Sequence, residues 1–482
     1  MFQDESVQTD TEASIVPEMT ESVGTRAWLA RHSRHGRTWL LAGLGIDKAI
    51  AFTILARGWA SLAGLVTVAL IARFLSPAEQ GYYYTFGSLI ALQIVFELGF
   101  SFVILQMASH ERAHLTFSSG GLISGDPIAH ARLASVLQKT IRWYTSAAVL
   151  LGVFLLTAGS YFFSAHPHSG ENISWHFPWY AAAFAAMFTF QLDPLLSFME
   201  GCGFVKNVAR LRIVQAVTGS MLAWLTLATH HGLFAPAMII GGNAGVASIW
   251  LFRRRDLLMP LLRKNAGEHR IHWTREVWPF QWRIAISWLC GYFIFQLYNP
   301  VLFAFRGAVA AGQMGMSLSL AGALSAVAVA WINTKAAPFG AMIARKEFQP
   351  LDRLFFKTLW QSVSVCAAGA LSVWLGVIYL NWAHLPFARR VLDPISMGFL
   401  LAVTVLNIVI NGEALYLRAH KQEKFLLPSI LGALLVAPST YFLGRSYGSF
   451  GIVTGSLAIG LFMGLPLATY IFIKYRRIWH EQ

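Results

Sequence analysis

Charged residues are scarce in this chain, because Asp, Glu, Lys and Arg make up only 12% of its 482 residues and just 23 residues are acidic. A soluble globular domain carries about twice this share of charge, so the composition excludes an ordinary soluble protein. Hydrophobic residues reach 56%, and the mean hydropathy is +0.54. We therefore expect a protein whose surface lies mostly in lipid.

The chain has only three cysteines, and it lacks the sequence patterns of a cleavable signal peptide and of barrel strands. The three cysteines, Cys202, Cys290 and Cys366, lie in or near apolar stretches without the spacing of metal ligands, so we expect no disulfide, no zinc and no cofactor. The first residues lack the positive segment and the apolar core of a cleavable signal peptide. No segment has the alternating ten-residue pattern of a barrel strand, which leaves helices as the membrane-crossing structure.

The chain instead contains twelve mostly apolar stretches. Each can supply the roughly 20 residues that a helix needs to cross about 30 Å of hydrocarbon. The predicted fold class is an all-α integral membrane protein with twelve transmembrane helices. The predicted spans are 50–72, 82–108, 141–163, 178–199, 208–229, 233–252, 284–305, 314–334, 357–380, 394–416, 425–443 and 450–473.

Basic residues are distributed unevenly between the connections. Of the 37 Lys and Arg residues, 31 lie in the two tails or in every second connection, five lie in the other connections, and Arg57 lies inside the first span. Because short cytoplasmic loops collect Lys and Arg, this bias predicts that both termini are cytoplasmic. It suits contact with anionic lipid head groups better than binding of nucleic acid.

A long connection, 253–283, carries eight of these basic residues and divides the spans into six and six. Such a division is typical of a duplicated transporter, and the segments 75–82 and 310–316 occupy equivalent places in the two halves. Since six is even, the repeats would be parallel, with a cleft between them as the route across. The predicted parts are a cytoplasmic tail (1–45), an N-terminal six-helix lobe (46–252), a basic cytoplasmic linker (253–283), a C-terminal six-helix lobe (284–475) and a second cytoplasmic tail (476–482).

One run of residues resembles a known family. The segment from Ala69 to Tyr84, ALIARFLSPAEQGYYY, continues into Ser88–Gln93 and Phe96–Phe100. It resembles the opening of polysaccharide exporters and oligosaccharide-lipid flippases, whose superfamily also contains the MATE drug antiporters and the lipid II flippases. The resemblance is strongest over 50–110, and it does not identify a substrate.

The resemblance implies a MATE-like pair of six-helix lobes in a bacterial cytoplasmic membrane. The lobes would open alternately to either side and flip or export a polyprenyl-diphosphate-linked oligosaccharide or polysaccharide precursor. A sugar head with a diphosphate cannot cross hydrocarbon unaided, so its path must be polar and preferably cationic. The expected partners are this lipid-linked glycan and membrane lipids, while a coupling cation and a polysaccharide synthase or polymerase remain open.

Polar side chains inside the predicted spans are the candidate functional residues, since a charge near a membrane centre costs about 2.5–3.5 kcal/mol unless it faces a cavity or a partner. Arg57 is the leading candidate for holding phosphate, and its structural alternatives are snorkelling to the head groups or pairing with an acid within the lobe. Gln93, a candidate substrate contact, and Glu97 form a polar stripe, in which Glu97 either carries a coupling proton or completes an ion pair. Asp193 precedes Pro194, and it is either a cation or proton site or a group that satisfies the kink.

The second half carries a comparable set of polar residues. Arg283 and Lys335 would complete a cationic substrate site, or they would anchor helix ends at the membrane interface. In the tenth span, Asn407 and Asn411 are four residues apart on one face; Asn411 is a candidate substrate contact, and Glu413 is a candidate site for a coupling ion or proton.

Three other functions stay open at this point. A MATE-like cation-coupled antiporter of small organic cations would need acidic residues to dominate its cavity. A membrane-embedded glycosyl or acyl transferase would need a general base or an acidic pair, often on a sizeable loop, and no outward loop exceeds roughly 15 residues. A scaffold without transport activity would not need polar spans. We therefore expect a transporter that performs no covalent chemistry.

Overall fold

The computed structural model describes residues 48–117, 123–166, 173–265, 267, 270–272, 276–420 and 424–480. The predicted cytoplasmic tail over 1–45 lies outside these residues. The chain divides into two units, Met1–Ala51 and Phe52–Gln482, and the helix packing is that of the second unit.

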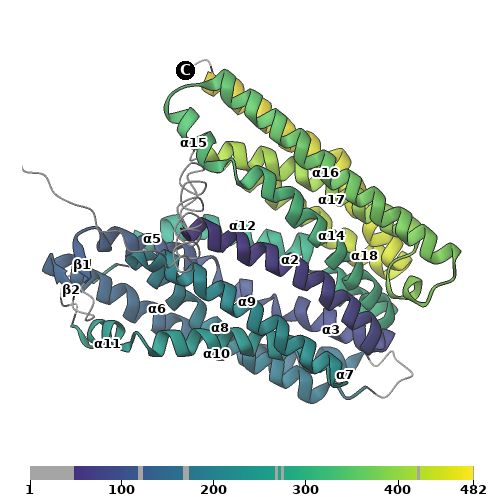
Figure 1. Cartoon of the computed structure of the whole chain (residues 1–482), viewed down its shortest axis with the longest axis horizontal. Helices are drawn as coiled ribbons and strands as arrows, with labels where there is room; N and C mark the ends of the chain where they lie inside the picture. The colour runs from purple at the N-terminus through teal and green to yellow at the C-terminus, as the bar shows by residue number, and fades with distance from the viewer. Residues whose placement is uncertain are drawn as a thin grey trace, which may run out of the picture. The chain divides into compact units, whose positions relative to one another are not determined.

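Helices dominate the described residues, which confirms the predicted all-α class (Figure 1). A short antiparallel hairpin, β1 (Leu115–Phe117) and β2 (Ile123–Gly125), is the exception among them. The helices of the first half are α2 (Lys48–Phe74), α3 (Pro77–Ile90), α4 (Gln93–Glu97), α5 (Phe100–Arg112), α6 (Pro127–Phe154), α7 (Ser160–Ala165), α8 (His176–Met199), α9 (Val205–Ala228), α10 (Ala235–Phe252) and α11 (Arg255–Arg263). Those of the second half are α12 (Trp278–Phe295), α13 (Tyr298–Arg306), α14 (Ala308–Asn333), α15 (Ala336–Ala344), α16 (Phe348–Trp382), α17 (Pro394–Ala419), α18 (Leu426–Ile459) and α19 (Leu465–His480).

Eight of the described helical segments are long and apolar enough to cross a membrane, or nine if one bent pair counts as a single span. The protein is therefore a multi-pass membrane protein. The bent pair covers the second predicted span: Pro77–Glu97 and Phe100–Arg112 meet at an angle of 45°. Leu98 and Gly99, at the bend, both have left-handed backbone conformations, with φ of 50° and 71°.

The helical segment Leu426–His480 is too long for one crossing, at 55 residues. Gly448 interrupts it with a φ of 65° and a ψ of −142°, which no helix contains. The Ser439 hydroxyl lies where a Cβ on Gly455 would be, although residues 16 apart in a straight helix are separated by about 24 Å. The chain therefore reverses at Gly448, and its two arms run antiparallel.

A second reversal joins α8 to α9 through a π-helical turn in which Gly203 has a φ of 94°. Thr189 of α8 donates to the Ile240 carbonyl at 3.1 Å, and Gln215 of α9 donates to the Asn243 carbonyl at 2.9 Å. Both acceptors lie within one turn of α10, whereas residues 189 and 215 of a straight helix would be about 39 Å apart. The two helices therefore pack side by side against α10 (Figure 1).

Two groups of helices follow from these contacts. In Figure 1, α6, α8, α9 and α10 lie together, and α14, α16, α17 and α18 form another group. The contacts of α3 with α13 and α14, and of α4 with α12, connect the two groups.

The contact between α3 and α14 requires small residues. A Cβ on Gly81 would overlap the Ala308 carbonyl, and a Cβ on Gly312 would lie 2.9 Å from the Gly81 nitrogen. Backbone therefore lies directly against backbone here. We name this contact, made by residues 77–84 and 308–315, the seam.

The sequence explains why α3 begins at the seam. The Ser76 hydroxyl accepts from the Glu79 N–H at 3.2 Å, and the Glu79 carboxylate accepts from the Ser76 N–H at 2.7 Å. Together with Pro77 in the first turn, this reciprocal capping box fixes the start of the helix.

Two side-chain amides of the seam form hydrogen bonds to the backbone of a third segment. Gln80 donates to the carbonyls of Gly312, at 2.8 Å, and Arg390, at 2.9 Å. Gln313 donates to the Arg389 carbonyl at 3.1 Å. The two related segments of the sequence are thus in direct contact, and both bind the backbone of the same short segment, 389–390.

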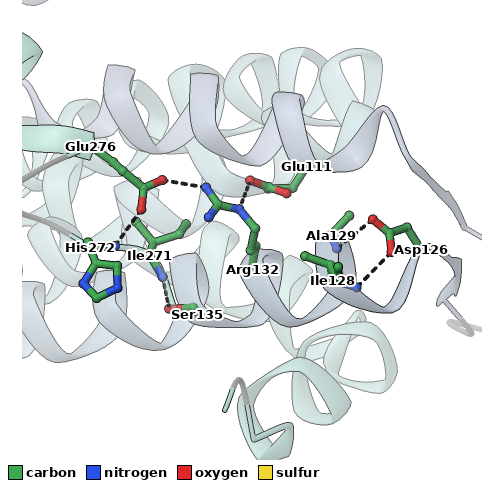
Figure 2. A network of polar contacts seen from close by, with 9 residues as sticks. All are labelled: Glu111, Asp126, Ile128, Ala129, Arg132, Ser135, Ile271, His272 and Glu276. Atoms are coloured by element: carbon green, nitrogen blue, oxygen red, sulfur yellow. Dashed lines mark hydrogen bonds and ion pairs between the residues drawn. The ribbon is translucent and has the colours of Figure 1, made fainter. Parts of the chain in front are cut away.

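The chain that precedes α12 is held on α5 and α6 by an ion-pair network (Figure 2). Arg132 of α6 donates to Glu111 of α5 at 2.7 Å and to Glu276 at 2.6 Å. Glu276 also accepts from the His272 N–H at 2.8 Å. The end of the predicted linker 253–283 is therefore fixed to the first group of helices.

Candidate substrate cavity

A cavity of about 800 Å³ lies among α12, α13, α14, α17 and α18, with α3 at one end. At that end its lining includes Tyr84 and Gly315, which belong to the seam. At the other end it includes Arg418, in the last turn of α17. The helix from Leu400 to Arg418, both lining residues, rises about 27 Å. This length is comparable to the roughly 30 Å hydrocarbon thickness of a bilayer.

The polar part of the lining is almost entirely uncharged. Arg418 is the only charged residue among the lining residues that the structure describes, and none of them is Asp or Glu. Hydroxyl and amide groups can donate to and accept from a neutral polar ligand, and a guanidinium can hold an anionic group. Six of the hydroxyl and amide residues are Ser88, Gln296, Asn299, Ser319, Asn407 and Asn411.

A broken helix lies beside the cavity. α12 ends at Phe295 and α13 begins at Tyr298, and Gln296 in the break lines the cavity. Pro300 has no N–H, so it cannot donate to the Gln296 carbonyl four residues before it. Broken helices at binding sites of transporters supply polar backbone groups in this way.

Asn299 connects this break to α3. Its side-chain amide donates to the Ser88 hydroxyl at 3.1 Å, and the Tyr292 hydroxyl donates to the Ser88 carbonyl at 3.3 Å. Elsewhere in the lining, the hydroxyls of Tyr298 and Ser456 are 2.8 Å apart. The Asn299 Oδ1 atom is buried, and no described residue is hydrogen-bonded to it.

Asn411 is the predicted site residue that lines this cavity. Its side chain is exposed, and its amide donates to the Asn407 carbonyl one turn earlier at 2.8 Å. Asn407 lines the cavity too, so the structure places the polar face of the tenth predicted span in the cavity.

Gln93, Glu97 and Asp193 lie elsewhere, on α4 and α8. Gln93 begins α4 and Glu97 ends it, next to the bend. Glu97 is close enough to Asp193 of α8 for their charges to interact. None of the three is among the described lining residues of the cavity.

The remaining predicted residues form two sets. Some are absent from the described lining of the cavity, and the others have no described side chain. Glu413 is buried on the side of α17 that faces α19, where it accepts from the Thr469 hydroxyl at 2.8 Å. Lys335 is half-buried at the start of α15. The side chains of Arg57, in α2, and Arg283, in α12, lie outside the described part of the structure.

Two lining residues have weak signals in the sequence. Arg418 follows the tenth predicted span, so it counts there as a basic residue of a cytoplasmic connection. Asn299 is a polar residue next to Pro300 inside an apolar span, a pattern that indicates a local helix break. Neither pattern alone places the residue in a cavity.

Solved structures of transporters share this fold. The MATE multidrug transporter DinF-BH matches with a TM-score of 0.58 and 14% identity, over 90% of this chain and 96% of that one. An inward-facing MATE family transporter of the MOP superfamily gives 0.56 and 13%, over 88% and 99%. The lipid II flippase MurJ, in an inward closed conformation, gives 0.53 and 13%, over 89% and 90%.

The fold is therefore that of MOP superfamily transporters, as the resemblance in the sequence predicts. No protein-family model matches the chain. No curated protein matches its sequence either.

Proposed function

We propose that this protein flips a polyprenyl-diphosphate-linked oligosaccharide or polysaccharide precursor across the bacterial cytoplasmic membrane by alternating access. The observation that carries this proposal is the lining of the cavity, which combines hydroxyl and amide groups with one arginine and, among the described residues, contains no carboxylate. A neutral sugar needs many uncharged hydrogen-bonding groups, and a diphosphate needs a cation. The polyprenyl tail can stay in lipid outside the helices.

The topology that we infer has twelve crossings. Beyond the eight long helices, the bent pair and the short apolar helix Gly58–Phe74 each supply one crossing. The reversals at Gly203 and Gly448 each divide a long segment into two. An even number places both termini on one side, and the excess of Lys and Arg assigns that side to the cytoplasm.

This topology assigns the cavity an orientation. Arg418, in the last turn of the tenth crossing, would face the cytoplasm, and the seam would close the outer end. The proposed lobes are 46–252 and 284–475, with 253–283 as the linker. In that arrangement a substrate enters from the inner leaflet and leaves when the seam separates.

The other predicted residues keep their proposed roles. Arg57, Arg283 and Lys335 would supply further positive charge for the diphosphate in another conformation. Glu97 and Asp193 form an acidic pair that would bind a coupling ion or proton, and Glu413 is a second candidate for that role.

The acidic pair also favours a second function, a MATE-like antiporter of organic cations. Such a substrate would bind near Glu97 and Asp193, among α4, α5, α6 and α8, instead of in the described cavity. The two functions therefore place the substrate in different groups of helices.

Purified protein in proteoliposomes separates these functions. A fluorescent polyprenyl-diphosphate oligosaccharide reports flipping when an impermeant quencher in the outside medium reaches newly exposed label, and a rhodamine dye reports cation transport. We expect protein-dependent flipping of the lipid-linked sugar and no gradient-driven transport of the dye. Dye transport without flipping would establish the antiporter instead.

A further inference from the structure

We propose that the seam end of the cavity is a hydroxyl-binding subsite centred on Asn299, which recognises a neutral sugar unit of the transported head group. This inference rests on the proposed function, because it assigns one part of that substrate to one part of the cavity. Arg418 would hold the diphosphate at the opposite end.

Asn299 has the hydrogen-bonding deficit that a ligand hydroxyl would fill. It lines the cavity, yet only 6% of its surface is exposed. One side-chain atom is hydrogen-bonded to Ser88, and Oδ1 has no described partner. Oδ1 is covered by its neighbours, so a ligand hydroxyl reaches it when the amide turns toward the cavity. An unpaired buried acceptor destabilises a protein, so a bound donor would stabilise this end of the cavity.

The deficit does not depend on how the amide is oriented. The Ser88 hydroxyl can donate or accept, so exchanging the oxygen and nitrogen of Asn299 still leaves one of them unpaired. A sugar hydroxyl also donates and accepts, and it satisfies Asn299 in either orientation.

The surroundings of Asn299 favour a neutral ligand over a cation. Gln296 lies in the break and lines the cavity, and its carbonyl lacks the usual helical donor. Tyr298 and Ser456, whose hydroxyls are hydrogen-bonded to each other, also line the cavity. These groups are all uncharged, and the described lining contains no carboxylate to neutralise a cation in a membrane interior. A polyol that offers several hydroxyls matches them better.

Two fluorescent probes in proteoliposomes test the subsite: a polyprenyl diphosphate that carries a neutral trisaccharide, and the same lipid without sugar. We expect Asn299→Ala to slow flipping of the sugar probe about tenfold, equivalent to about 1.4 kcal/mol, while the sugar-free probe stays within about twofold of the unmodified protein. The matched control is Asn381→Ala on α16. The Asn381 amide donates a hydrogen bond to the Val377 carbonyl of its own helix, and Asn381 is not among the described lining residues of the cavity. Both probes should move at the unmodified rate in this control.

Ser88→Ala provides a second variant that decides the question if Asn299→Ala does not fold. It removes the hydroxyl that orients Asn299, so we expect a loss of about threefold for the sugar probe alone. An equal loss for both probes would make Asn299 and Ser88 structural residues, and an unchanged sugar rate would remove the subsite.

A cation site would have a different signature. Replacing sodium by choline would then slow the unmodified protein but not Asn299→Ala, and this result would overturn the proposal. If the unmodified protein moves neither probe, the proposed function fails and the subsite fails with it. If it moves both probes and Asn299→Ala changes neither rate, the subsite alone fails.

Discussion

The seam and the cavity are neighbours along α3 and α14, yet opposite kinds of contact form them. At the seam, Gly81 and Gly312 bring two backbones together, and Gln80 has both of its carbonyl acceptors in place. Within two turns of α3, Ser88 lines an open volume with an incompletely bonded amide beside it. One helix thus contributes a closed contact at one level and a polar binding surface at the next.

This comparison explains what the motif in the sequence means. Ser76, Pro77, Glu79, Gln80 and Gly81 cap α3 and build the seam. The residues that resemble the polysaccharide exporters therefore define the contact that closes one end of the cavity. Two residues of the resemblance, Tyr84 and Ser88, also line the volume in which we place the substrate.

The largest expected effect comes from breaking the seam. Gly81→Val would place a branched side chain against the Ala308 carbonyl, and such overpacking costs about 1–3 kcal/mol or more. We expect a large drop in the melting temperature in detergent and loss of flipping. The matched control is Gly376→Ala on α16, where a Cβ meets no atom within 4 Å, and its melting temperature should stay equal or rise. A melting temperature for Gly81→Val equal to that of the unmodified protein would show that the seam is not tightly packed.

A smaller effect is expected from changing the cavity while the seam stays intact. Arg418→Gln removes the charge that we assign to the diphosphate, and a charge-assisted hydrogen bond of about 1.5–3 kcal/mol corresponds to a decrease of about ten- to a hundredfold in flipping. The melting temperature should hardly change. Arg445→Gln, at an exposed arginine outside the cavity lining, is the control. Equal rates for the two variants would contradict the role of Arg418.

The smallest effect is expected at the ion pair that fixes the linker. Burial alone would raise the pKa of Glu276, but hydrogen bonds from Arg132 and the His272 N–H and the charge of Arg132 outweigh it, so its pKa lies below the ordinary value. Its stabilising contribution is therefore complete at neutral pH and is lost as the pH falls through that lowered pKa. Because Glu276 is one-third exposed, Glu276→Gln should cost less than about 1 kcal/mol.

Thermal melting of that variant between neutral and acidic pH measures this contribution. The difference from the unmodified protein should be small at pH 7 and should vanish in acid. Glu347→Gln, at a more exposed pair with an N–O distance of 3.9 Å, is the control. A difference that grows as the pH falls would contradict the ion-pair account.

Much of the fold follows from the sequence because membrane crossings have a strong signal. Lengths of apolar sequence predict the helices. Asn407 and Asn411, one turn apart in the tenth predicted span, both line the cavity. The number of crossings and the side on which the termini lie stay predictions, although the reversals at Gly203 and Gly448 agree with the predicted boundaries of the spans.

The position of the cavity could not be predicted in the same way. Glu97 and Asp193 are expensive to bury and therefore stand out in a sequence, but neither is among the described lining residues of the cavity. Uncharged residues such as Ser88 and Asn299 cost less and occur in many spans. Their convergence depends on the seam, which brings α3 against α13 and α14 across more than 200 residues of sequence.

The most direct test of the account is a cryo-EM structure of the protein with a bound polyprenyl-diphosphate oligosaccharide. We predict sugar density next to Asn299 and diphosphate density in contact with Arg418, inside the cavity among α12, α13, α14, α17 and α18. Head-group density beside Glu97 and Asp193, with this cavity empty, would contradict it.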